Sequence, residues 1–280
     1  MPNELRRCAV PLTKLQSHVL RILADHRSPE SFVAGGIVLN REGPRFSGDI
    51  DIFNDIAAKL ESIVANDMEV LRQAGLTVSL NDPRSSDIRK GKITGLGDQT
   101  EIDWVFDSDF RFFPAIKDEQ FGYALHPVDL AINKASAAAS RRVPRDIIDL
   151  LTIDRHILPL GPVLCAAVGR FPGPSPEELL DDISRNSRFT PPEFQALAVD
   201  RPLDPADVYR NIKLMLERAR DFIARMPSGA LGIVFLRDGK AAEPDPDRLT
   251  DFVKHEGKRR GHWPTSSEIG SAMLEKYQET

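Results

Sequence analysis

Apolar side chains recur at helical spacing in two stretches of the first half of the chain. Residues 11–27 carry an apolar stripe, and residues 55–75 form an amphipathic run that Gly75 closes. The segments SFVAGG, LTVSLND, DIRKGKITG and TEIDWVFD are instead short and rich in strand-forming residues, and IVLN after the first of them predicts a short helix. This succession of helices and strands predicts an α/β (α+β) fold with a mixed sheet.

The segment FSGDIDIF alternates between apolar and polar residues with period two, as a half-buried strand does. The pattern turns Ile50 and Ile52 toward the core and Asp49 and Asp51 to the opposite face. Because two carboxylates on one face of a strand contribute nothing to packing, the segment predicts a charged ligand there. The alternative is a solvated strand face, since exposed acids are common.

Helical spacing dominates from the segment HPVDL onward. Two runs, residues 128–141 and 145–153, flank Pro144, which is expected to end or kink the first of them. The stretch DPADVYRNIKLMLERARDFIARM predicts a long helix, while ALGIVFLRDGK fits either a late strand or a buried helical segment. The loop-like composition of GRFPGPSPEE makes it the best candidate for a boundary within the chain. We expect two units, residues 1–156 with the sheet and residues 157–280 with mainly helices.

Composition limits the classes of protein to consider. With 41% hydrophobic and 28% charged residues, the chain is typical of a globular protein. No apolar run approaches the roughly 18 residues of a membrane span, and no secretory signal pattern is present, so a cytoplasmic location without membrane partners is expected. Two cysteines, Cys8 and Cys165, exclude a disulfide framework and a cysteine-based zinc site. The formal charge of −5 disfavours a general DNA-coating role.

The acids of FSGDIDIF are suited to a divalent cation. Asp49 and Asp51 are two residues apart on a strand, so they lie roughly 6.5–7 Å apart along the chain and repel each other unless a cation lies between them. Hard oxygen ligands suit Mg²⁺, whose coordination shell substrate phosphates complete. Asp103, in the strand TEIDWVF, offers a third carboxylate and predicts a two-metal site for phosphoryl chemistry. A surface acid is the alternative for Asp103.

Residues ahead of these acids are suited to phosphate. Gly35 and Gly36 end a strand and start a helix, where free backbone N–H groups favour anions. Arg45 offers a guanidinium, and Ser47, on the same face as the acids, offers a hydroxyl for polyphosphate oxygens. Because the chain contains neither GxGxxG nor GxxxxGK[ST], a dinucleotide or P-loop site is not supported. The pattern favours a nucleoside triphosphate (NTP).

These blocks, taken in order, resemble a known superfamily. A glycine pair followed by DxD and by a third acid on a later strand resembles the DNA polymerase β-type nucleotidyltransferase superfamily. The segment RFSGDIDIF, together with the helical blocks LAINK and RDIIDL, resembles the AbiEii/AbiGii family of nucleotidyltransferase toxins. The resemblance covers roughly residues 15–155. It implies a polymerase β-like core, so that residues 1–156 form a catalytic domain that includes the helices with Lys134 and Asp146.

The resemblance implies a role for each residue of these blocks. Asp49, Asp51 and Asp103 would hold Mg²⁺, with two ions expected, and Asp103 would help to deprotonate the attacking hydroxyl. Lys134 would reach the triphosphate, and Asp146 would orient Lys134 or assist the acceptor. The phosphates would lie against a glycine pair and a serine, namely Gly35, Gly36 and Ser47.

The sequence departs from the family pattern at two places, and the role of a further acid stays open. The third acid is preceded by Thr-Glu-Ile, so Glu101 is a second candidate for its role. Arg145 stands where many members of the family have lysine. Asp149, three residues after the first acid of RDIIDL and on the same helical face, is either part of the site or an anchor for Arg142 or Arg145. For Lys134 the alternative is a solvated helix face.

The resemblance implies transfer of NMP from an NTP to an acceptor, either tRNA or protein, by a toxin that a cognate antitoxin counters. Two alternatives stay open: a small-molecule nucleotidyltransferase of the antibiotic-modifying type, and a non-catalytic nucleotide-binding regulatory module. Residues 157–280 are expected to bind the acceptor or a partner. Within them KHEGKRRGHWP, residues 254–264, combines basic charge with Trp263, which suits RNA, although a solvated basic loop fits equally.

Overall fold

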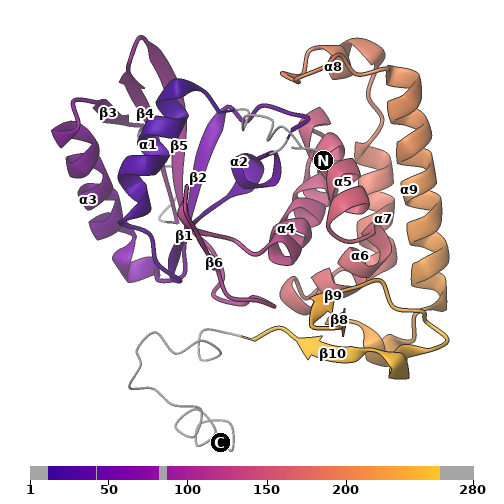
Figure 1. Ribbon diagram of the computed structural model, residues 1–280. Helices are drawn as coiled ribbons and strands as arrows, with labels where there is room; N and C mark the ends of the chain where they lie inside the picture. The colour runs from indigo at the N-terminus through magenta and orange to yellow at the C-terminus, as the bar shows by residue number, and fades with distance from the viewer. Residues whose placement is uncertain (1–11, 42, 82–86, 259–280) are drawn as a thin grey trace, which may run out of the picture.

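The computed structural model describes residues 12–41, 43–81 and 87–258. Figure 1 shows a sheet-containing half beside a helical half. The sheet-containing half consists of α1 (Lys14–Ala24), β1 (Ser31–Ala34), α2 (Gly35–Leu39), β2 (Asp49–Asn54), η1 (Ala57–Lys59), α3 (Leu60–Gln73), β3 (Thr77–Leu80), β4 (Ile88–Gly95), β5 (Asp98–Phe106), β6 (Ile116–Asp118) and β7 (Gly122–Ala124). The order of elements that the sequence predicts is confirmed, while β6 and β7 have no counterpart among the predicted strands.

Seven strands form one mixed sheet in the order β3-β4-β5-β2-β1-β7-β6. β2 runs parallel to β5 and β1 runs parallel to β7, whereas the other neighbouring pairs are antiparallel. The alternation in β2 places Ile50 and Ile52 in the core, where both are 0% exposed. The predicted mixed sheet and the predicted orientation of this strand are confirmed.

The two faces of the sheet differ in what covers them. On one face, Leu15 of α1 and Val64 of α3 pack with Ile52 of β2 in one hydrophobic cluster. On the opposite face, α2 and α4 lie at the β1–β2 side (Figure 1). Farther along that face, Lys92 of β4 and Glu101 of β5 are exposed. The carboxylates of β2 therefore lie at the border between the helices and an open sheet surface.

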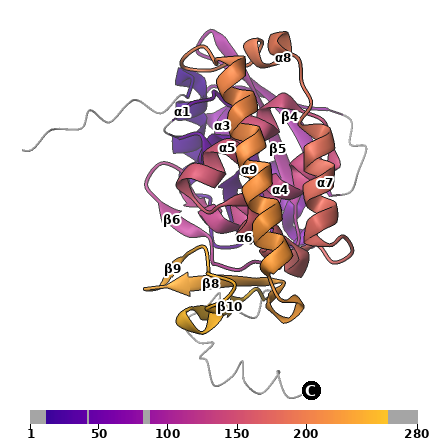
Figure 2. The same ribbon diagram turned by 90° about the vertical axis from the view of Figure 1, so that its right-hand side faces the viewer.

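The helical half begins at the strand-to-helix transition after β7. It contains α4 (Pro127–Ser140), α5 (Pro144–His156), α6 (Leu160–Arg170), α7 (Pro176–Asn186), α8 (Pro191–Gln195) and α9 (Pro205–Arg225). In Figure 2 the long helix α9 runs along the front of this half, with α7 beside it. Pro144 is the first residue of α5, which confirms the predicted break. Among the described residues, no single helix is both long and apolar enough to cross a membrane.

One hydrophobic cluster extends through the helical half. It contains Ala131 of α4, Leu150 of α5, Val163 of α6 and Ile212 of α9. Helices on both sides of residue 156 thus share a core. The segment GRFPGPSPEE contains the end of α6, a short connection at residues 171–175 and the start of α7, and the two helices pack against each other. The division of the chain after residue 156 stays a prediction.

A small second sheet follows α9 and a 3-10 turn, η2 (Ser228–Ala230). It consists of β8 (Ile233–Arg237), β9 (Lys240–Ala241) and, after η3 (Leu249–Asp251), β10 (Val253–Glu256), in the order β10-β8-β9. Of the two structures that fit ALGIVFLRDGK, the late strand is confirmed as β8. The alternative of a solvated basic loop is wrong for the start of KHEGKRRGHWP, because this part pairs with β8 as β10. Residues 259–264 lie outside the described residues, so the RNA-binding role stays a prediction.

Candidate active site

β2 and β5 bring the predicted acids together. The two strands pair in parallel, with Asp51 beside Asp103 and Asp49 beside Glu101. Because neighbouring strands are about 4.8 Å apart, side chains at paired positions on the same face lie next to each other. Asp49 and Asp51 are half-buried between fully buried isoleucines. The sheet register therefore places three predicted site acids and Glu101 on one face.

Asp51 lies in the most constrained position of the group. Burial, reinforced by the neighbouring charges of Asp49 and Asp103, raises the pKa of Asp51 to about 6 from its ordinary 3.8, and the charge of Lys134 offsets part of this. The Asp51 carboxylate lies directly over Gly35, where an added Cβ would come within 1.7 Å of Oδ2. Gly35 also has a φ of +71°, which favours glycine. Gly35 is thus required by the position of the acid.

Positive side chains accompany the other two acids. Arg145 Nη1 lies 3.6 Å from Asp49 Oδ2. Lys90 of β4, which is paired in register with Asp103, forms an ion pair with the Asp103 carboxylate. The hydrogen bonds to Asp146 raise the pKa of Arg141, and the charges of Asp51 and Asp49 add to this. The cluster therefore combines carboxylates from the sheet with cations from the helices and from β4.

The segment leading into β2 packs against the glycine pair. Ser47 donates a hydrogen bond to Asp49 Oδ1 at 3.1 Å. A Cβ on Gly36 would come within 2.5 Å of Arg45 Nη2 and within 2.8 Å of Ser47 Oγ. Arg45 is almost fully buried, and its guanidinium binds Asp149 through Nε and Nη2, both at 3.0 Å. The side chain of Arg45 is thus committed to a protein partner, and its proposed contact with phosphate stays a prediction.

Asp149 is the centre of a buried hydrogen-bond network. Its carboxylate, which is 0% exposed, accepts from Arg45, from Asn40 Nδ2 at 2.9 Å and from Lys134 Nζ at 2.8 Å. Burial alone would raise the pKa of Asp149, but the charges of Lys134 and Arg45 and their hydrogen bonds outweigh it and lower the pKa. Asp149 therefore stays ionised and holds both cations in place.

Asp146 lies one helical turn before Asp149 and faces the same lysine. Its carboxylate accepts from Arg141 Nε at 2.7 Å and from Arg141 Nη2 at 3.1 Å, and Lys134 Nζ lies 3.9 Å away. Lys134, of which 9% is exposed, therefore lies between two buried acids, so the alternative of a solvated helix face is wrong.

The alternative in which Asp149 anchors Arg142 or Arg145 is wrong. Arg142 instead binds Glu193 and the carbonyl of Arg188, and Arg145 points to Asp49. The physical reason is that Pro144 starts a new helix whose buried face carries Asp149 toward α2 and α4, away from the two arginines. The two acids of RDIIDL do share one helical face, as their spacing predicts.

The acids fit a Mg²⁺ ion in charge and in donor type. Asp49 and Asp51 offer hard oxygen ligands on one strand. A cation would offset both the burial and the repulsion from Asp49 that raise the pKa of Asp51. Asp103 is the less suitable donor, because its carboxylate is bound by Lys90. Over residues 12–41, 43–81 and 87–258, no group of three or more histidine, cysteine or acidic side chains is arranged so that it could hold a metal ion. The three-acid, two-ion site stays a prediction.

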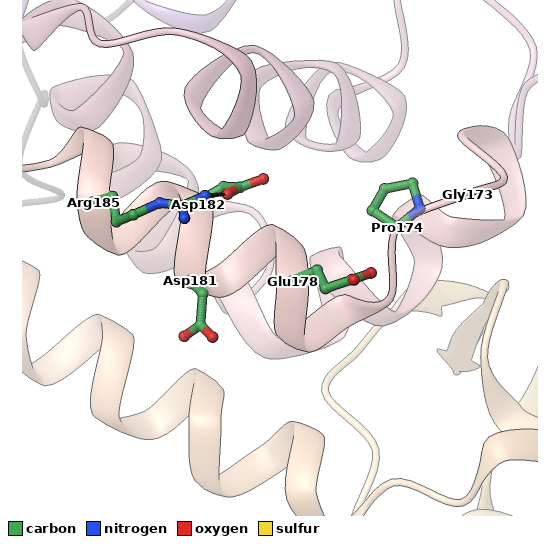
Figure 3. A pocket seen from close by; sticks show the side chains of 6 residues that line it. All are labelled: Gly173, Pro174, Glu178, Asp181, Asp182 and Arg185. Carbon is green, nitrogen blue, oxygen red and sulfur yellow. Dashed lines mark hydrogen bonds and ion pairs between the residues drawn. The ribbon is translucent and has the colours of Figure 1, made fainter.

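Hollows on the surface lie elsewhere. Figure 3 shows one of about 520 Å³ at the start of α7, lined by Glu178, Asp181 and Asp182 among others. The residues that line it come from one short stretch, 173–185, whose acids and Arg185 form the ordinary exposed face of a helix. A larger cleft of about 1220 Å³ lies between α5, α9 and the β8–β9 turn. None of the predicted site residues lines either of them.

Two residues of the cluster, Asn40 and Lys90, were not identified from the sequence. Asn40 gives no signal, because an asparagine at the end of a short helix is an ordinary cap. Lys90 is one of several lysines in DIRKGKITG, and only the register of β4 against β5 identifies it as the partner of Asp103. The signal in the sequence that could have identified Lys90 is the alternation of lysine in DIRKGKITG, which has the same period of two as the acids of TEIDWVF.

Comparisons with known proteins support the fold. No protein family model and no curated protein sequence matches the chain. Among solved structures, the chain is similar to MenT4, a nucleotidyltransferase toxin from Mycobacterium tuberculosis H37Rv, with a TM-score of 0.53 and 14% identity over 77% of this chain and 83% of that chain. A structure of Cid1, an RNA terminal uridylyl transferase, matches with a TM-score of 0.29 and 12% identity over 95% and 84%, a likeness too low to carry an argument. The chain has the predicted polymerase β-like nucleotidyltransferase fold with a mainly helical second half.

Proposed function

We propose that the protein is a Mg²⁺-dependent nucleotidyltransferase that transfers NMP from an NTP to an acceptor hydroxyl and releases pyrophosphate. One observation carries the proposal: the carboxylates of Asp49 and Asp51 share a sheet face with Asp103, beside a lysine that two buried acids hold in place. A fixed cation next to clustered acids is the arrangement that binds a metal–triphosphate complex and balances its charge.

Asp49 and Asp51 would hold Mg²⁺, which supplies charge neutralisation at the α-phosphate when bound. Lys134 would bind a non-bridging phosphate oxygen as a compact point charge. Gly35 and Gly36 let the side chains of Asp51, Arg45 and Ser47 approach the backbone closely, and their own N–H groups would donate to phosphate oxygens. The Ser47 hydroxyl, 3.1 Å from Asp49, would also donate to a phosphate oxygen. These residues together fix the triphosphate relative to the attacking group, and such positioning supplies most of the rate in phosphoryl transfer.

Asp103 would accept the proton of the acceptor hydroxyl. The hydroxyl oxygen then forms a bond to the α-phosphorus, the bond from that phosphorus to the bridging oxygen breaks, and pyrophosphate leaves with the electron pair. Lys90 would have to leave the Asp103 carboxylate, or share it, for this step. Glu101, exposed beside Asp49, is the second candidate for the same role.

The acceptor in this proposal is tRNA or a protein, and the biological role is that of a toxin with a cognate antitoxin. The resemblance of RFSGDIDIF, LAINK and RDIIDL to AbiEii/AbiGii toxins supports this role, and so does the likeness in fold to MenT4, itself described as a nucleotidyltransferase toxin. Arg141 and Arg145 are close to half exposed beside the acids, where they would meet an anionic acceptor.

A transfer assay tests the proposal. The purified protein is incubated with Mg²⁺, each α-labelled NTP in turn, and an extract that contains total RNA and protein. We expect label in one size class of RNA or protein for the wild type, and a loss of at least about 100-fold for Asp51→Asn. The matched control is Asp181→Asn, which removes an exposed acid of α7 and should transfer normally. Equal labelling by wild type and Asp51→Asn would contradict the proposal.

The labelled species identifies the acceptor class. Label that resists protease and disappears with ribonuclease indicates RNA, and the converse indicates protein. Binding of Mg²⁺–NTP without label in either fraction, even after small metabolites are added, would leave a nucleotide-binding module without transferase activity and would overturn the proposed reaction.

A further inference from the structure

We propose that Asn40 is a positioning residue for nucleotide binding: it ties the turn of Gly35 and Gly36 to the carboxylate that holds Lys134. This inference rests on the proposed function and assigns a residue that lies outside the motifs. It makes one side chain responsible for the alignment of the two phosphate-binding elements, the short helix α2 and the helix α4.

Asn40 is placed between these two elements by three hydrogen bonds. Its backbone N–H and its Nδ2 both donate to the carbonyl of Gly36, each at 3.0 Å. The same Nδ2 donates to Asp149 Oδ1 at 2.9 Å. Only 2% of Asn40 is exposed, so water does not compete for these contacts. A single amide group therefore bridges the glycine turn and the centre of the cation network.

The bond from Asn40 controls the orientation of the Asp149 carboxylate. Oδ1 accepts from Asn40 and from Arg45 Nε, while Oδ2 accepts from Arg45 Nη2 and from Lys134 Nζ. A carboxylate turns readily about its last bond, because that torsion has broad minima. Without Asn40, the carboxylate can rotate on the arginine fork, and the ammonium of Lys134 follows it. The position of the phosphate-binding cation thus depends on an uncharged donor.

The chemistry of the site selects asparagine. Aspartate has the same shape but would place a second carboxylate against Asp149 and compete for Lys134 and Arg45. An apolar residue of similar size would fill the space but donate nothing. Within the described part of the chain, Oδ1 of Asn40 is buried without a hydrogen-bond partner. A residue needed only for packing has no reason to bury such an acceptor, so the donor side of the amide accounts for asparagine here.

The experiment measures affinity for Mg²⁺ with a non-hydrolysable NTP analogue by calorimetry. The variants are Asn40→Ala, Asn40→Asp, Lys134→Met and the double variant Asn40→Ala/Lys134→Met, and thermal unfolding reports their folding. We expect Asn40→Ala to weaken binding about tenfold and Asn40→Asp to weaken it further. In the Lys134→Met background we expect Asn40→Ala to add less than about twofold, since both changes then act through the same ammonium. Asn66→Ala, at an exposed asparagine of α3, is the matched control and should bind as the wild type does.

Each outcome decides between the claims. Wild-type affinity in Asn40→Ala, or in a folded Asn40→Asp if the alanine variant does not fold, would overturn the positioning role. An equal loss in the presence and absence of Lys134 would also overturn it, because the residue would then act on structure in general. A wild type that neither binds the analogue nor transfers nucleotide would instead overturn the proposed function.

Discussion

Two of the buried arginine–aspartate pairs in the described part of the chain lie on opposite sides of the central sheet. Behind the sheet, Arg27 binds Asp67, which also accepts from Trp104 Nε1 at 2.8 Å. On the other side, Arg45 binds Asp149. All four charged side chains are at most 4% exposed, so burial and ion pairing alone do not distinguish the two pairs.

The pairs differ in how many cations surround the acid. Asp67 is bound by Arg27 and by the neutral indole of Trp104, so one cation balances its charge in the protein interior. Asp149 has Arg45 and Lys134, a surplus of positive charge that lies next to the half-buried acids of β2. In the first pair each charge has its partner inside the protein, so removal of either one leaves an uncompensated buried charge. The second pair fixes Lys134 beside the sheet face that carries the acids of β2, where a bound triphosphate would require a cation.

The largest effect on stability is expected when Asp67, the acid of the Arg27–Asp67 pair, is removed. Asp67→Ala leaves the Arg27 guanidinium buried without a counter-charge, so we expect a loss of about 3–5 kcal/mol in the free energy of unfolding, measured with urea. The folded fraction should bind Mg²⁺–NTP as tightly as the wild type, because Arg27 and Asp67 lie behind the sheet. A variant with normal stability would contradict the comparison, and so would one that loses binding while folded.

Removal of Lys134 should have the opposite effect, namely a large loss of transfer activity with a smaller loss of stability. Lys134→Met leaves Asp149 with Arg45 and Asn40, and Asp146 with Arg141, so each buried acid keeps a partner. We expect nucleotide transfer to fall at least about 100-fold, which corresponds to about 2.7 kcal/mol. The loss of unfolding free energy should be smaller than in Asp67→Ala. A reversed order of the two stability losses would show that the lysine is structural.

The pH dependence of metal affinity sharpens the contrast further. The pKa of Asp51 is raised to about 6, so below that pH a proton occupies the carboxylate that Mg²⁺ would use. We expect the apparent affinity for Mg²⁺ to fall about tenfold for each pH unit below 6 and to level off above it. Calorimetric titration between pH 5 and 8 measures this. A flat profile would exclude Asp51 as a ligand.

The smallest effect is expected for an exposed pair. Arg185 and Asp182 form an ion pair on α7 with the arginine 71% exposed, at the hollow shown in Figure 3. Arg185→Ala should change the unfolding free energy by less than about 1 kcal/mol and leave transfer unchanged. A transfer defect in this variant would contradict this expectation and indicate that the acceptor binds at α7.

Periodicity predicted those parts of the fold that bury one regular face. The alternation of FSGDIDIF predicted β2 and its orientation, and the helical stripes predicted α1 and α3. Short elements without a repeated face were missed: β6 and β7 have three residues each, and β10 begins with an exposed valine among polar residues. Their pairing depends on neighbouring strands distant in sequence, which a local pattern does not contain.

The residues of the candidate site also fall into two groups, those that a local sequence pattern identifies and those that it does not. The motif acids and Lys134 could be identified because their residue types and spacing are local. The partners of Asp149 could not, since Arg45 and Asn40 lie over 100 residues away along the chain and reach it only once α2 packs near α5. Lys90 requires the β4–β5 register in addition. Spacing therefore predicted which chemistry is present, and tertiary packing determines which groups carry it.

Thermal unfolding of Asp51→Asn at pH 7.5, with and without Mg²⁺ and a non-hydrolysable NTP analogue, tests the central claim most directly. A folded-state pKa of about 6, above the ordinary 3.8, means that the folded chain binds the proton more tightly, so stability from this group is present at low pH and lost as pH rises through about 6. At pH 7.5 the charged carboxylate therefore destabilises the ligand-free protein, and the neutral amide should raise stability by about 1–3 kcal/mol.

The same substitution should abolish the increase in Tm that Mg²⁺–NTP gives the wild type, because a ligand stabilises only the fold that binds it. We predict a variant that is more stable alone and unresponsive to the ligand. A variant that is less stable than the wild type and still stabilised by Mg²⁺–NTP would contradict the account, since Asp51 would then be a structural acid.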